Sequence, residues 1–158
     1  MAVIVVGMAD LKAARSPDSL TTLGLGSCVG ITLYDPARRI GGMAHIMLPN
    51  SADFGGQNRA KFADTAIPDL VAEVVGMGAA KQTLVAKLAG GAHMFGGLQR
   101  DILSVGKRNA AACAEILRRL RIPVISNDTG GSHGRTIELL LDTGSLRIKT
   151  IGFGEKYI

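Results

Sequence analysis

Short apolar or alternating segments, separated by glycine-rich turns, make up much of the chain and predict β-strands. Asp142-Thr143-Gly144 lies between the last two of these segments and is typical of a hairpin turn. The sequence therefore predicts a fold in which short strands end in tight turns. The predicted strands comprise residues 3–6, 20–25, 28–34, 40–48, 83–89, 122–126, 136–141 and 145–151.

Two longer segments show helical periodicity instead. Apolar positions recur every three or four residues across residues 62–77, and again from about residue 107 to residue 120. Pro68 falls within the first segment, so we expect its regular turns to begin near Asp64 or Thr65, or to bend at the proline. In the second segment Cys113 lies on the apolar stripe, which predicts that its thiol is buried.

Together these elements predict an α/β fold. We expect one domain over residues 1–158, a layered α/β sandwich with a mainly antiparallel sheet packed by two main helices. The pattern does not give the order of the layers. Two segments connect the predicted helices and strands. The polar residues 50–57 predict an exposed loop that could gate a site, and the glycine-dense residues 90–97 predict a crowded backbone.

Composition supports a globular protein. Hydrophobic residues make up 47% of the chain and charged residues 20%, which argues against intrinsic disorder. The apolar residues 2–7 follow no basic residue and are too short for a signal peptide, and no apolar run approaches the roughly 20 residues that cross a bilayer. Cys28 and Cys113 lack metal-site spacing. We therefore expect free thiols, no metal, no cofactor and a cytoplasmic location.

The net charge of +5 permits an acidic partner but does not require nucleic acid. Basic residues are scattered or form short pairs, such as Arg38-Arg39 and Arg118-Arg119, which usually lie on solvated faces. With four phenylalanines, two tyrosines and no tryptophan, the chain offers little for bases to stack on. We expect neither nucleic-acid binding nor membrane insertion.

The candidate chemistry lies in one predicted hairpin. If strands 28–34 and 40–48 pair across a two-residue loop, Asp35 opposes Arg38 and Cys28 faces His45. This register also places Val29, Ile31 and Leu33 on a common core face. A slip by one residue would separate Cys28 from His45, whereas a slip by two would loosen the pair and leave both on one face. An adjacent imidazole can take the thiol proton and generate a nucleophilic thiolate.

Less specific interpretations of the same residues remain open at this point. A cysteine at the start of a strand is usually a small buried side chain, and a lone histidine more often satisfies a local hydrogen bond. The glycines at 24, 26 and 30 do not form a nucleotide-binding motif, because their spacing is one residue too long and a strand follows them. They could free amide groups near Cys28 to hold an oxyanion, although the donors are not identifiable from the sequence.

Five segments in order resemble the CheD family of chemoreceptor glutamine deamidases. The most specific are Thr-Leu-Gly-Leu-Gly-Ser-Cys-Val at residues 22–29 and Met-Ala-His-Ile-Met-Leu-Pro at residues 43–49. The others are Ala-Lys-Leu-Ala-Gly-Gly-Ala at 86–92, Gly-Lys-Arg-Asn at 106–109 and Asp-Thr-Gly-Gly at 128–131. The resemblance spans almost the whole chain.

The resemblance implies a three-layer α/β fold and a hydrolase that converts selected glutamines in the methylation helices of chemoreceptors to glutamate. It implies a catalytic triad of Cys28, His45 and Thr22, in which Thr22 orients the imidazole. Some hydrolysis of receptor methyl esters and binding to a CheC-type phosphatase would follow. The alternative is a non-catalytic adaptor that docks on receptors or on such a phosphatase. His93 and His133, together with Asn109 and Asp128, are expected to lie outside the chemistry.

Overall fold

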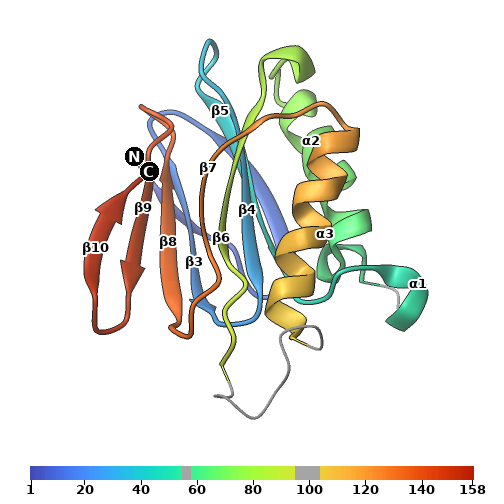
Figure 1. The fold of residues 1–158 in the computed structure, drawn as a ribbon. Coiled ribbons are helices and arrows are strands. Elements are labelled where there is room, and N and C mark those ends of the chain that lie inside the picture. Colours follow the sequence, from blue (N-terminus) through green and yellow to red (C-terminus); the bar gives the residue numbers. More distant parts are fainter. Residues whose placement is uncertain (55–57, 95–103) are drawn as a thin grey trace.

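The computed structural model describes residues 1–54, 58–94 and 104–158, whose strands form two five-stranded sheets (Figure 1). Strands β1 and β3 pair in parallel, as do β6 and β7, and all other neighbours are antiparallel. In spatial order, sheet A contains β1 (Val3–Val5), β3 (Ser19–Leu25), β8 (Arg135–Leu140), β9 (Leu146–Thr150) and β10 (Gly154–Tyr157). Sheet B contains β2 (Asp10–Arg15), β5 (Ile40–Ile46), β4 (Val29–Asp35), β6 (Val85–Gly90) and β7 (Val124–Thr129).

The helices form a third layer on the outer face of sheet B (Figure 1). The two long ones are α2 (Ala63–Gly76) and α3 (Val105–Arg119). Shorter elements are α1 (Ser51–Phe54) and the 3₁₀ turns Arg59–Lys61 and Lys81–Thr83. The layers therefore run helices, sheet B, sheet A. No helix in the described part of the chain is long and apolar enough to cross a membrane.

Two apolar cores separate the three layers. One lies between the helices and sheet B and includes Ile31, Leu70 and Leu117. The other lies between the two sheets and includes Met43 and Ile137. Sheet B is covered on both faces, so every residue of β4 and β5 is buried, whereas buried residues alternate along β8 because sheet A is covered on one face.

These observations confirm the predicted α/β class, the antiparallel pairing and the two main helices. Helix α2 begins at Ala63, so Pro68 follows the first turn, and Cys113 is fully buried. Strands β2 and β10 were not predicted, and β7 extends three residues beyond the predicted strand 122–126, through residues 127–129. Part of each predicted loop, at residues 55–57 and 95–97, lies outside the described residues.

The predicted register of the β4–β5 hairpin is wrong by two residues. Asp35 pairs with Ile40, and His45 pairs with Gly30 instead of Cys28. The loop contains four residues because Asp35 closes it: its carbonyl accepts a hydrogen bond from Arg39 N–H at 2.8 Å, and its carboxylate accepts one from Ala37 N–H at 3.0 Å. A shift by two preserves the alternation of faces, so the predicted core face is unchanged.

Candidate active site

The three predicted site residues come together at the open end of the β4–β5 hairpin, between the two sheets. Cys28 directly precedes β4, His45 is the penultimate residue of β5, and Thr22 belongs to β3 of sheet A. Their exposed fractions are 8%, 1% and 0%, respectively. Two residues from sheet B thus meet one from sheet A in a buried environment.

Thr22 fixes the orientation of the His45 ring. The Thr22 hydroxyl donates to the carbonyl of Val6 at 2.6 Å, and the same oxygen lies 2.7 Å from Nδ1 of His45. A hydroxyl has one proton and a carbonyl only accepts, so the Thr22 oxygen is the acceptor for a proton on Nδ1. This arrangement leaves Nε2 with a free lone pair, the state that a general base requires.

Nε2 of His45 is one of the two buried side-chain nitrogen or oxygen atoms without a hydrogen-bond partner in the described residues. Cys28 is a diagonal neighbour of His45 across the hairpin, because Gly30 lies directly opposite. Diagonal side chains are separated by about 7 Å at their Cβ atoms, so the thiol and the imidazole share a face without a hydrogen bond. Catalytic hydrogen bonds are often long in a ligand-free enzyme and shorten when substrate binds.

Burial favours the neutral form of both groups. It raises the pKa of the Cys28 thiol, an effect that the backbone N–H of the same residue partly offsets, and it lowers the pKa of His45. The sequence predicts an imidazole that takes the thiol proton and generates a thiolate. The buried site instead favours a thiol beside a neutral imidazole, so proton transfer would accompany attack on a substrate.

Hydrogen bonds to backbone carbonyl groups hold the segment around Cys28 in place. Gly91 N–H donates to the carbonyl of Cys28 at 2.9 Å, and Ala92 N–H donates to that of Gly26 at 2.8 Å. At Gly90, which has φ of +106°, an added Cβ would lie 2.3 Å from the Cys28 oxygen. Only glycine allows this close approach, which accounts for the glycine-dense segment that begins here.

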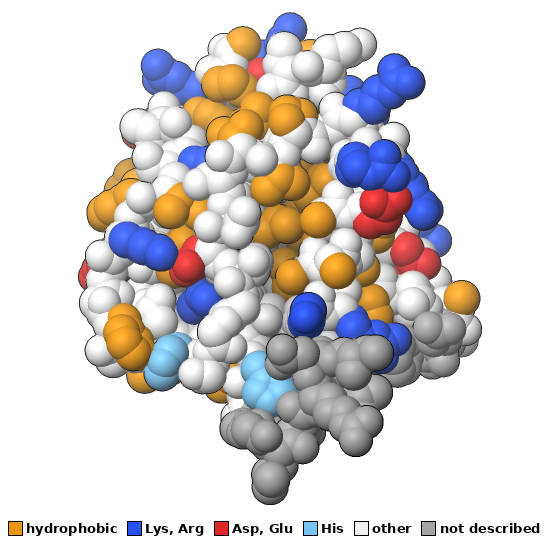
Figure 2. Space-filling view, in the orientation of Figure 1, with side chains coloured by type: hydrophobic (Ala, Val, Ile, Leu, Met, Phe, Trp, Pro, Cys, Tyr) orange, Lys and Arg blue, Asp and Glu red, His pale blue; other side chains and the backbone are white. Residues whose placement is uncertain are grey.

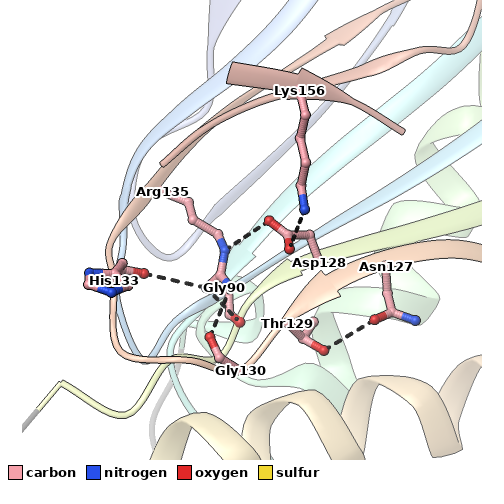
Figure 3. A network of polar contacts seen from close by, with 8 residues as sticks. All are labelled: Gly90, Asn127, Asp128, Thr129, Gly130, His133, Arg135 and Lys156. Atoms are coloured by element: carbon pink, nitrogen blue, oxygen red, sulfur yellow. Dashed lines mark hydrogen bonds and ion pairs between the residues drawn. The ribbon is translucent and has the colours of Figure 1, made fainter. Parts of the chain in front are cut away.

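A polar network links this segment to sheet A (Figure 3). Arg135 of β8 donates to Gly90 O at 3.3 Å and to Gly130 O at 2.9 Å, and its Nε lies 3.1 Å from the Asp128 carboxylate. Lys156 of β10 contacts the other oxygen of Asp128 at 3.0 Å. The network therefore joins both sheets directly behind the strand end that carries Cys28.

Two adjacent cavities open near the site. One, of about 230 Å³, is lined by Ser27 and Met47, which are close in sequence to Cys28 and His45, and by Met94. The other, of about 340 Å³, contains Lys107. His93 and Ser104 line both cavities. Cys28, His45 and Thr22 line neither of these two cavities, but Ser27 and Met47 place the smaller one beside the strand ends that carry Cys28 and His45.

The other two histidines, His93 and His133, lie in loops, and histidine side chains are visible at the surface in Figure 2. His93 lies in the loop beside the cavities, and its backbone N–H donates a hydrogen bond to the carbonyl of Gly131 at 2.8 Å. His133 is exposed and its ring contacts Phe153, with 4.3 Å between the ring centroids. No group of three His, Cys, Asp or Glu side chains able to hold a metal occurs among the described residues.

Comparison with known proteins identifies the family. A profile described as "CheD chemotactic sensory transduction" matches residues 47–150. The chain belongs to the CheD family. "Probable chemoreceptor glutamine deamidase CheD" of Caldanaerobacter subterraneus subsp. tengcongensis is 52% identical over 97% of this chain and 96% of its own length. The "Chemoreceptor glutamine deamidase CheD" of Halalkalibacterium halodurans is 48% identical over 99% of this chain and 98% of its own length.

Moorella thermoacetica has a CheD relative, also named a probable chemoreceptor glutamine deamidase, that is 53% identical over 93% of this chain and 90% of its own length. The similarity extends through the N-terminal third, which the profile match does not cover and which contains Thr22, Cys28 and His45. Family membership therefore applies to the segments that build the site as well as to the helices.

Two residues outside the predicted triad touch the site's backbone: Asn109, a motif residue expected to lie outside the chemistry, and Arg135, which the sequence did not single out. Asn109 is fully buried in α3 and its amide contacts carbonyls near both Cys28 and His45. The available signal was a polar residue on the apolar stripe of a helix, four residues before Cys113. Arg135 offered no such signal, because an arginine at the start of a strand is ordinarily exposed.

Proposed function

We propose that this CheD protein is a hydrolase, a chemoreceptor glutamine deamidase, in which Cys28 is the nucleophile, His45 the general base and Thr22 the residue that orients His45. The observation that carries the proposal is the His45 ring: Thr22 holds Nδ1 at 2.7 Å, while Nε2 is buried on the face that it shares with Cys28 and has no partner within residues 1–54, 58–94 and 104–158. A base in this state suits activation of a thiol.

The reaction follows from these atoms. As Sγ of Cys28 attacks the carboxamide carbon of a glutamine side chain, its proton moves to Nε2 of His45. The imidazolium returns that proton to the leaving nitrogen, and ammonia departs as the C–N bond breaks and a thioester remains. Neutral His45 then takes a proton from water, whose oxygen attacks the thioester. The C–S bond then breaks, the imidazolium returns its proton to Sγ, and glutamate is released as the thiol is restored.

The same thioester route would hydrolyse a receptor methyl ester, with methanol as the leaving group. We include this activity in the proposal as secondary, because a protein that binds the receptor segment around one glutamine presents the same Cys28 to a methyl ester in its place. Incubation with a methylated receptor fragment should release methanol with wild type and not with Cys28→Ala. Release by both proteins would remove this part of the proposal.

Mass spectrometry of a receptor fragment tests the deamidation. Each modified glutamine gains about 1 Da, and the gain should disappear with Cys28→Ala. Cys113→Ala is the matched control, because Cys113 is the second buried thiol and belongs to the helix layer, away from His45. Equal deamidation by wild type and Cys28→Ala would end the proposed mechanism.

The second candidate function is a non-catalytic adaptor, with a CheC-type phosphatase or the receptor as the docked partner. The family resemblance supports phosphatase binding, and we expect a CheC-type partner to compete with the receptor fragment. A pull-down with increasing receptor fragment would measure this competition. An adaptor alone would bind both partners and leave every glutamine mass unchanged.

A further inference from the structure

Asn109 occupies an unusual place in α3. The residues of this helix that are buried against the rest of the molecule are Gly106, Asn109, Cys113 and Leu117. Asn109 has an exposed fraction of 0%, and it lies behind sheet B, on the side opposite to sheet A. A polar side chain in such a position costs free energy unless hydrogen bonds replace its contacts with water.

The side-chain amide of Asn109 joins the two strand ends that carry the site. Its Nδ2 donates to the carbonyl of Ser27 at 2.9 Å and to that of Met47 at 3.0 Å. Ser27 directly precedes Cys28, and Met47 is the second residue after His45. Both partners can only accept, so the orientation of the amide is fixed, because the flipped group would place its oxygen against two carbonyl oxygens.

The bond to Ser27 also orients the amide of Cys28. The Ser27–Cys28 peptide is trans, so its carbonyl and the Cys28 N–H point to opposite sides. With the carbonyl directed at α3, the N–H is directed toward the face where the thiol lies. In residues 1–54, 58–94 and 104–158 no backbone or side-chain oxygen accepts a hydrogen bond from this N–H. Its interaction with the sulfur of the same residue agrees with this direction.

We propose that Asn109 is a positioning residue for the deamidation: it holds the Ser27–Cys28 peptide so that the Cys28 N–H stabilises the oxyanion, and it fixes the distance between the Cys28 and His45 strand ends. The inference rests on the proposed function. When Sγ attacks the carboxamide, negative charge develops on the carboxamide oxygen, and a donor already directed at that oxygen needs no reorganisation during the reaction.

The Oδ1 atom of Asn109 supports a role in the reaction over a role in folding. With His45 Nε2, it is one of the two buried side-chain nitrogen or oxygen atoms without a partner in the described part of the chain. A buried oxygen without a partner destabilises the folded state, and a well-packed apolar residue would avoid that cost. The two bonds from Nδ2 are the feature that only an amide in this place supplies.

Two variants test the inference. Asn109→Asp keeps the shape and replaces the double donor by a carboxylate, and Asn109→Leu removes both bonds together with the unpartnered oxygen. We expect kcat for deamidation to fall about 100-fold in both, with KM within about twofold, because misplacement of reacting groups by about 1 Å has an effect of this size. The Asp variant has a further signature. The buried carboxyl of this variant has a raised pKa and donates one hydrogen bond when protonated. The loss of kcat relative to wild type should therefore become smaller as the pH falls.

Cys113→Ala is the control, because it disturbs the same face of α3 one turn later without touching Ser27 or Met47. Melting temperatures identify which variants are folded, and the rate of Cys28 alkylation by iodoacetamide reports the site without any receptor. The inference is overturned if both Asn109 variants retain kcat within about threefold of wild type, or if Cys113→Ala reproduces their loss at an equal melting temperature. Failure of wild type to deamidate would instead overturn the proposed function.

Discussion

The two ends of the β4–β5 hairpin differ in how they treat buried polar atoms. At the closed end the Asp35 carboxylate is fully buried and accepts hydrogen bonds from the N–H groups of Ala37, Arg38 and Ala80 and from the Arg38 guanidinium. At the open end His45 Nε2 and Asn109 Oδ1 are buried and have no hydrogen-bond partner among the residues that the structure describes.

Hydrogen bonding at the closed end also determines charge. Burial alone would raise the pKa of Asp35, but the hydrogen bonds from Ala80, Thr83, Arg38 and Ala37 outweigh it and lower the pKa, so the carboxylate stays charged. At the open end burial lowers the pKa of His45, so the neutral ring is favoured. The closed end of the hairpin therefore holds a charged, hydrogen-bonded carboxylate, and the open end holds the neutral ring that we propose as the base.

Short of replacing Cys28 or His45 itself, the largest expected effect of breaking this contrast comes from Thr22→Val. The variant keeps the shape of the side chain and removes the acceptor for Nδ1–H, so the ring loses its fixed tautomer and orientation. We expect kcat to fall about 100-fold, measured as the rate of mass gain in a receptor fragment. Thr21→Val is the matched control, because the Thr21 hydroxyl also donates to a carbonyl, that of Ile137, but lies on the other face of β3. Equal losses in both variants would contradict the role of Thr22.

Asp35→Asn should act on stability and leave catalysis intact. In either orientation, the NH₂ group of the new amide faces a backbone N–H that donates to the carboxylate in the wild type. Because that hydrogen bond is lost, we expect a loss of about 2 kcal/mol in the free energy of unfolding. Urea unfolding measures the change. Asp69→Asn, which breaks an exposed pair with Arg59, should cost less than about 1 kcal/mol. A loss of kcat in folded Asp35→Asn would refute the division between the two ends.

Arg135→Lys should produce a smaller, mixed effect. Lysine keeps the charge but cannot reach Asp128, Gly90 and Gly130 together, so we expect a loss of about 1 kcal/mol in stability and a fall of a few fold in kcat. Arg147→Lys, in a more exposed ion pair of the same sheet, is the control. Unchanged unfolding and kcat would show that the network does not support the Cys28 strand.

The smallest effect is expected from mild acidification. Burial lowers the pKa of His45 below its usual 6.5, so the ring stays neutral, and able to accept the thiol proton, as the pH falls from 8 to about 6.5. We expect kcat/KM to remain flat across that interval and to fall only at lower pH, where the ring becomes protonated. An acid limb centred above pH 7 would contradict the neutral, buried base.

The elements could be predicted where alternation or helical spacing was strong. That Cys28 and His45 lie on one face of the hairpin was also predictable, because a register shifted by one residue would move the apolar side chains out of the core. The pairing itself was not, because the loop length depends on how the Asp35 carboxylate binds backbone amides. Division of the strands into two sheets also escaped prediction, since both faces of β4 and β5 are apolar in the sequence whatever layer covers them. Cys28 and His45 were named from spacing and Thr22 only from the family resemblance, whereas Asn109 was a motif residue expected to lie outside the chemistry.

The central claim is that the open end of the hairpin performs the chemistry and the closed end maintains the fold. The most direct measurement is the mass of a receptor fragment after incubation with His45→Gln or Asp35→Asn, at a temperature where both variants are folded. The account predicts a gain of about 1 Da per modified glutamine with Asp35→Asn and no gain with His45→Gln. Deamidation by His45→Gln at the wild-type rate would contradict it.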